Sequence, residues 1–241
     1  MRISGRGGIA ALIAAMTGVA AQGAMLSGTV VLQNSRSASV NRHSDYSGVV
    51  VSAVAIGATA PRDFAPRHAV IRQKSKTFSP HILPVEVGTQ VDFPNFDPIF
   101  HNAFSNYNGQ IFDIGLYPPG SSRSVRFSRP GVVRVFCNIH PTMSAIILVL
   151  PTSHFTMTRP DGSFALDLPS GDYQMNFFHE RATEQTLAAL SRRITVNGEP
   201  LRLPPVAISE AGYLPAAHMN KYGRNYGPPP DDQTYYPGAR K

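Results

Sequence analysis

Apolar and polar residues alternate in short runs along most of this chain, and turn residues separate the runs. Four such runs are LSGTVVLQ, VVVSAVAIG, ILPVEV and VVRVFC, each of a length typical of a β-strand. Glycine and proline, 20 and 21 of the 241 residues, stand between them. Helical periodicity is scarce, and Glu180 to Arg192 is its best candidate. The pattern predicts an all-β chain built from β-sandwiches.

The run VVRVFC carries the single cysteine of the chain. Side chains alternate across a strand, so Val133, Val135 and Cys137 are predicted to share the face that meets the core. The next apolar run, Ala145 to Leu150, has the composition of a fully buried strand. Between these two strands lies a loop with His140 and Met143. Loops at the ends of core strands are places where a rigid scaffold can hold ligands.

Taken alone, Cys137 has a simple interpretation as a buried, unreactive thiol. A copper ion used for electron transfer prefers two imidazoles and one thiolate, with a weak thioether at longer range. Cys137, His140 and Met143 supply three of these four groups. His101, in the stretch DPIFHNAFSNYNG, is the candidate for the second imidazole. The neighbouring Asn102 can hydrogen-bond across to the cysteine loop and tie the two ligand loops together.

Two kinds of catalytic metal site are disfavoured by the residues present. His179-Glu180 begins the zinc-protease pattern His-Glu-x-x-His, but Thr183 stands where the second histidine is required. Additional coppers of multicopper oxidases need His-x-His pairs, and the sequence contains none. The other histidines are interpreted as surface or structural residues.

The stretches VGTQVDFPNFDPIFHNAFS and FDIGLYPPGSSRSVRFSRPGVVRVFCNIHPTMSAIILV together resemble the cupredoxins, the small blue copper proteins. The Cys-x-x-His-x-x-Met spacing is similar to that of the amicyanin and pseudoazurin members. The resemblance covers about residues 69 to 150 and implies a Greek-key β-sandwich. It also implies one type 1 copper ion held by His101, Cys137, His140 and Met143, with Asn102 behind them. In that family the second loop histidine, here His140, lies near the surface in an apolar patch where redox partners dock.

The expected organisation has five parts. Residues 1–24 have arginines, an apolar run and small residues in the order of a secretory signal peptide, with cleavage after Ala21 or Ala24 both open. Residues 25–68 are expected to form an N-terminal β extension that packs on the cupredoxin copper-binding domain, 69–151. Residues 152–212 are expected to form a second small β-sandwich, and they resemble the carboxypeptidase-regulatory or transthyretin-like domain. Residues 213–241, rich in Tyr, Pro and Gly, are predicted to be a flexible tail.

The whole chain resembles exported bacterial proteins of the methylamine-utilisation or plastocyanin-like type. The resulting prediction is a periplasmic blue copper protein that carries single electrons between redox proteins docking near His140. A copper-binding adaptor or copper-handling module of an envelope assembly is the alternative, and a copper oxidoreductase is a third, disfavoured hypothesis. The formal net charge of +7 is not concentrated in a basic run, so we expect no nucleic-acid partner. No apolar run after the signal is long enough for a membrane helix.

Overall fold

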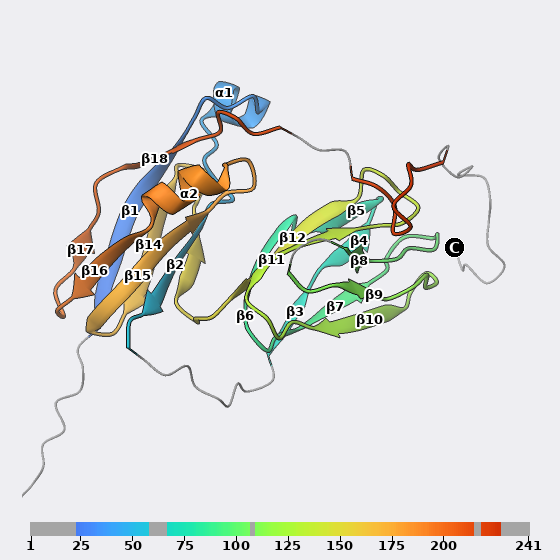
Figure 1. Ribbon diagram of the computed structural model, residues 1–241, viewed down its shortest axis with the longest axis horizontal. Coiled ribbons are helices and arrows are strands. Elements are labelled where there is room, and N and C mark those ends of the chain that lie inside the picture. Colours follow the sequence, from blue (N-terminus) through green and yellow to red (C-terminus); the bar gives the residue numbers. More distant parts are fainter. Residues whose placement is uncertain (1–22, 58–66, 107–108, 215–217, 228–241) are drawn as a thin grey trace, which may run out of the picture.

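The computed structural model describes residues 23–57, 67–106, 109–214 and 218–227 (Figure 1). The predicted signal peptide lies almost wholly outside these ranges. Strands dominate the described chain, which confirms the all-β prediction. They form two β-sandwiches, each with its own hydrophobic core.

The first sandwich, here called the terminal sandwich, contains strands from both ends of the chain. One sheet consists of β14 (Ser163–Leu168), β1 (Ala24–Gln33), β17 (Leu201–Arg202) and β18 (Val206–Ser209). The other consists of β13 (Phe155–Met157), β2 (Val50–Ala55), β15 (Gly171–Phe178) and β16 (Arg192–Val196). Two helices belong to this half, α1 (Ala38–His43) and α2 (Glu184–Leu190).

The second, here called the central sandwich, contains β3 to β12. One sheet consists of β10 (Ser122–Arg126), β7 (Gln90–Pro94) and β3 (His68–Val70). The opposite sheet consists of β6 (Ile82–Glu86), β12 (Ser144–Leu150), β11 (Gly131–Phe136), β8 (Phe104–Ser105) and β9 (Phe112–Asp113). A hairpin of β4 (Arg72–Lys74) and β5 (Thr77–Ser79) completes it.

The position of β1 and β2 corrects the expectation that residues 25–68 pack on the copper-binding domain. β1 pairs antiparallel with β14 and parallel with β17 and β18, and β2 lies between β13 and β15. Every second residue of β1 from Ala24 to Leu32 is buried or half-buried toward this core, so its alternating pattern is satisfied there. A side chain at Gly162 would run into the Val30 carbonyl, and glycine therefore permits this close approach. The central sandwich is an insertion between β2 and β13 of the terminal one.

The two sandwiches meet through an apolar junction of Val50 from β2, Ile82 from β6, and Ile146, Leu148 and Leu150 from β12. Val50 thus brings β2 into contact with the central sandwich. Beside this junction, His81 Nε2 lies 2.6 Å from Glu180 Oε2. His81 precedes β6 and Glu180 follows β15, so the pair links the two halves of the molecule.

The His81–Glu180 pair predicts a pH-dependent contribution to stability. The hydrogen bond to Glu180 raises the pKa of His81. A raised folded-state pKa stabilises below the ordinary histidine pKa, and this stabilisation is lost as pH rises through the folded value. His81 is half-exposed, so we expect at most about 1 kcal/mol. Urea unfolding at several pH values should show this loss in the wild type and not in His81→Gln. The exposed His43→Gln variant should follow the wild type; a His81→Gln curve parallel to the wild type would contradict the expectation.

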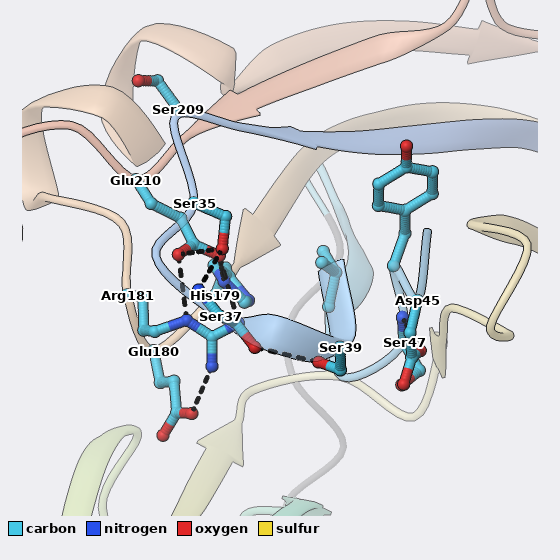
Figure 2. A network of polar contacts seen from close by, with 12 residues as sticks. Ser35, Ser37, Ser39, Asp45, Ser47, His179, Glu180, Arg181, Ser209 and Glu210 are labelled. Carbon is cyan, nitrogen blue, oxygen red and sulfur yellow. Dashed lines mark hydrogen bonds and ion pairs between the residues drawn. The ribbon is translucent and has the colours of Figure 1, made fainter. Parts of the chain in front are cut away.

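A buried polar network fixes the end of β18, as Figure 2 shows. Glu210 accepts hydrogen bonds from His179 Nε2 at 2.9 Å, Arg181 Nε at 3.0 Å and the Ser35 hydroxyl at 2.8 Å. Burial favours a protonated Glu210, but the Arg181, His179 and Ser35 donors together hold its pKa below the ordinary value. The chain that follows Glu210 therefore leaves the terminal sandwich from a fixed point.

The remaining differences from the sequence prediction are local. The helix expected over 180–192 is confined to α2, because the Thr183 hydroxyl accepts a hydrogen bond from Thr186 N and caps its start. The short strands β5, β8, β9 and β13 were not predicted, since two or three residues carry too little periodicity to be seen. The likeness of residues 152–212 to a carboxypeptidase-regulatory domain stays a prediction.

Candidate metal centre

Cys137 follows directly after β11 and points into the core of the central sandwich. Val133, Val135 and Cys137 are all fully buried, as the two-residue period predicts. A tight loop follows: Met143 N donates to His140 O at 3.1 Å, and Cys137 N donates to Met143 O at 3.2 Å. These two bonds fold the Cys-x-x-His-x-x-Met stretch back on itself, so that its members are close in space.

His101 is held by backbone pairing on the neighbouring segment. His101 N donates to Tyr117 O at 3.2 Å, and Tyr117 N donates to His101 O at 2.9 Å. Tyr117 is itself buried, and its hydroxyl donates to Phe93 O at 2.8 Å. His101 is fully buried beneath these contacts, which leaves its imidazole little freedom to turn.

Three of the predicted ligands converge. The Cys137 sulfur lies 3.9 Å from His101 Nδ1 and 3.6 Å from His140 Nδ1, and the candidate donor atoms all lie within 4.8 Å of one another. Within the described ranges, no other group of three or more His, Cys, Asp or Glu residues brings its ligand atoms close enough together to hold a metal ion. Met143 is fully buried in the same apolar cluster as Cys137, and its role as the weak fourth ligand stays a prediction.

Asp97 fixes the orientation of the His101 ring, a role that sequence reasoning missed. His101 Nε2 donates to Asp97 Oδ2 at 2.7 Å, so the proton is on Nε2 and the Nδ1 lone pair faces the cysteine sulfur. Asp97 also accepts from Lys76 N at 2.8 Å and from Ser75 N. Burial acts to raise the pKa of Asp97, but these donors together hold it below the ordinary value. An aspartate four residues before His101 was the available signal.

Burial sets the protonation states of the thiol and the imidazole in the metal-free site. Burial is the main cause that raises the pKa of Cys137, while backbone N–H groups of Asn102, Ile139 and His140 act in the opposite direction. Burial also lowers the pKa of His101, against the opposing effect of Asp97. The imidazole is therefore neutral near pH 7 and can donate a lone pair, and the thiol must lose its proton to become a ligand.

Asn102 bridges the two ligand loops. Asn138 N donates to Asn102 Oδ1 at 2.6 Å, which is the cross-loop bond predicted for this residue. Asn102 Nδ2 donates to Asp113 Oδ1 at 2.9 Å. The loop of His101 and the loop of Cys137 are thus linked directly through the Asn102 side chain.

The donor set fits copper. One thiolate and two imidazoles from a buried, tightly bonded scaffold are the ligands that a copper electron-transfer site requires. The closely spaced sulfur and Nδ1 atoms in the core supply all three.

Two expectations near the site need correction. The resemblance implied that His140 lies near the surface, but His140 is only 5% exposed. The tail from residue 213 was predicted to be flexible, but residues 218–227 make several hydrogen bonds to the ligand loop and its surroundings. His218 was interpreted as a surface or structural residue, and nothing local in the sequence relates it or Tyr226 to Cys137.

The chain matches no model of a known protein family and no curated protein sequence. Among solved structures it is similar to a copper-containing nitrite reductase from Thermus scotoductus SA-01, at 28% identity, TM-score 0.33, over 41% of this chain and 25% of that one. It is also similar to a purple cupredoxin from Nitrosopumilus maritimus, at 26% identity, TM-score 0.30, over 35% and 99% of the two chains. A Cu(I) amicyanin variant gives 19% identity and TM-score 0.33 over 41% and 92%. The match therefore spans a quarter of the nitrite reductase, and TM-scores this low do not by themselves establish a shared fold.

The raised pKa of Cys137 makes a prediction for metal uptake. Because the metal-free thiol is protonated at neutral pH, copper binding should release about one proton from it. Affinity should then rise by about tenfold per pH unit below the thiol pKa. Proton release in weak buffer and binding curves at several pH values measure this directly. The Cys137→Ser variant is the control, and a pH-independent affinity in the wild type would contradict the prediction.

Proposed function

We propose that this protein is an exported blue copper protein of the cupredoxin type that transfers single electrons between redox partners. The observation that carries the proposal is the convergence of the Cys137 sulfur with the Nδ1 atoms of His101 and His140 inside a core. A bound copper ion would supply a one-electron couple at this point. Met143, from the same loop, is proposed as the weak fourth ligand.

The residues around the ligands support this function by limiting movement. Asp97 orients His101, Asn102 bonds the two loops together, and the backbone bonds at Cys137 and Met143 close the ligand loop. A site whose ligands are held in one arrangement needs little reorganisation when its charge changes, and this favours rapid electron exchange.

The proposed donor set also bears on the choice between carrier and enzyme. Four protein ligands from a buried scaffold leave no open position for a substrate, whereas catalytic metal sites keep one. We therefore propose an electron carrier. Copper handling within an envelope assembly remains the competing function, because the burial of His140 also suits a site that retains its metal.

Periplasmic location is part of the proposal. The N-terminal residues have the order of a secretory signal. Ala24, the first residue of β1, is buried and pairs with Leu168 of β14. Cleavage after Ala21 therefore keeps β1 whole, whereas cleavage after Ala24 removes its first residue. None of the helices in the described ranges is long and apolar enough to cross a bilayer.

Voltammetry of the copper-loaded full-length protein tests the function. An electron carrier should give a reversible one-electron wave that persists over many cycles without loss of metal. Loss of copper from the protein on each reduction would contradict electron transfer and favour the copper-handling alternative. Transfer of copper to a chelator that is faster than electron transfer to the electrode would do the same.

A further inference from the structure

Residues 218–227, here called the C-terminal strap, lie on the loop that carries Cys137 and His140. Figure 1 shows this segment, drawn in red, beside the central sandwich. His218 Nε2 donates to Pro141 O at 2.8 Å, and the Tyr226 hydroxyl donates to Cys137 O at 2.9 Å. Lys221 N donates to the Asn138 side chain at 3.0 Å. The strap thus bonds the loop on both sides of His140.

Two further contacts fix the strap on itself and on the sheet. The His218 ring stacks on Phe136 with ring centroids 4.0 Å apart, and its Nδ1 lies 3.0 Å from the Tyr226 hydroxyl. Phe136 is the residue of β11 that points away from the core, and it is nevertheless only 6% exposed. The strap therefore packs on apolar surface at the end of β11, rather than resting on the loop by polar contacts alone.

The strap also completes a closed ring of four side chains and two backbone amides. Lys221 Nζ lies 2.7 Å from Asp113 Oδ2, Asp113 accepts from Asn102, and Asn102 accepts from Asn138 N. Asn138 in turn accepts from Lys221 N. The strap therefore contacts the Cys137 loop directly, and it is linked to the His101 loop through Asp113 and Asn102.

We propose that the C-terminal strap is a built-in cover that locks the metal-ligand loop shut and limits access to the site from the His140 side. Upstream of the strap, the chain is fixed to the terminal sandwich at Glu210, which accepts hydrogen bonds from His179, Arg181 and Ser35. A molecule that reaches the ligands from this side has to meet the strap or displace it. This inference rests on the proposed function only in taking the loop to be a copper-ligand loop.

Chemical labelling of the metal-free protein tests the strap without copper. Cys137 is the single cysteine and is fully buried, so a disulfide reagent such as dithionitrobenzoate labels it only when this part of the central sandwich opens. Deletion of residues 215–241 should accelerate labelling by more than about tenfold, because three hydrogen bonds to the loop are lost. Deletion of 228–241 alone keeps the strap and is the matched control, which should label at the wild-type rate.

A point variant gives the same test if the deletion prevents folding. Tyr226→Phe removes the hydroxyl that bonds Cys137 O and should accelerate labelling by about fivefold, the effect of one hydrogen bond. Tyr222→Phe, on an exposed side chain of the same segment, should have no effect. Amide exchange in β7, in the opposite sheet of the central sandwich, must stay unchanged in Tyr226→Phe, which separates local opening from unfolding of the whole central sandwich.

Two results would overturn the proposal. One is equal labelling rates in the wild type, the 215–241 deletion and Tyr226→Phe. The other is faster labelling that is matched by equally faster amide exchange in β7. Neither result depends on copper, so failure of the strap is distinguishable from failure of the electron-transfer function, which the voltammetry reports.

Discussion

Cys137→Ser is expected to abolish the intense blue colour of the copper-loaded protein, because that colour arises from charge transfer between a thiolate and Cu(II). A serine hydroxyl has nearly the same size but is not ionised at neutral pH and is a poor ligand for copper. Copper retained by His101 and His140 alone should be nearly colourless and easily removed by a chelator. Visible absorption and chelator competition on the two proteins measure the effect.

The control for this variant must disturb the same strand without changing a proposed metal-ligand atom. Val135→Ala removes buried volume from the same face of β11 and should lower stability by about 1–3 kcal/mol. It should still bind copper with the blue colour. A blue Cys137→Ser protein would show that the colour comes from elsewhere.

Asp97→Asn is expected to weaken copper binding by about 10- to 100-fold, the usual effect of removing a partner that orients a ligand histidine. The Asp97 carboxylate accepts from His101 Nε2, Lys76 N and Ser75 N, and an amide has one acceptor oxygen in place of two. At least one buried donor is then left opposite an NH₂ group, so the variant should also lose about 1–3 kcal/mol of stability.

The pH dependence of this loss has a defined sign. The folded-state pKa of Asp97 lies below the ordinary value, so its stabilisation is complete above the ordinary pKa and is lost as pH falls through the lowered one. The difference between wild type and Asp97→Asn in urea unfolding should therefore shrink in acid. Asp167→Asn makes the same chemical change on the exposed face of β14 and should match the wild type. Equal copper affinities for wild type and Asp97→Asn would contradict the positioning role.

The sequence predicted the features that depend on local pattern. The alternation in VVRVFC predicted the inward direction of Cys137, which the structure confirms as fully buried. The strand positions of β1, β2, β11 and β12 followed from apolar runs bounded by turns. The grouping of His101 with Cys137 and His140 came from the chemistry that copper requires and from the family resemblance, since 36 residues separate His101 from the cysteine.

The features that the sequence did not predict depend on long-range contacts. The alternating pattern of β1 fits a half-buried strand of either sandwich, and its pairing with β14 is decided by contacts far along the chain. Asp97 stands only four residues before His101, and its role was missed because the spacing alone does not show that the loop brings the two side chains together. The strap was taken for a flexible tail because it has few aliphatic residues, yet it is fixed by polar groups of the ligand loop and by one ring stacked on Phe136.

An optical titration of the metal-free, full-length protein with Cu(II), followed by one cycle of reduction and reoxidation, tests the central claim most directly. The account predicts an intense blue band that saturates at one copper per chain, bleaches on reduction and returns in full on reoxidation. A colourless complex in the wild type, or a colour that does not return, would contradict a blue copper electron carrier.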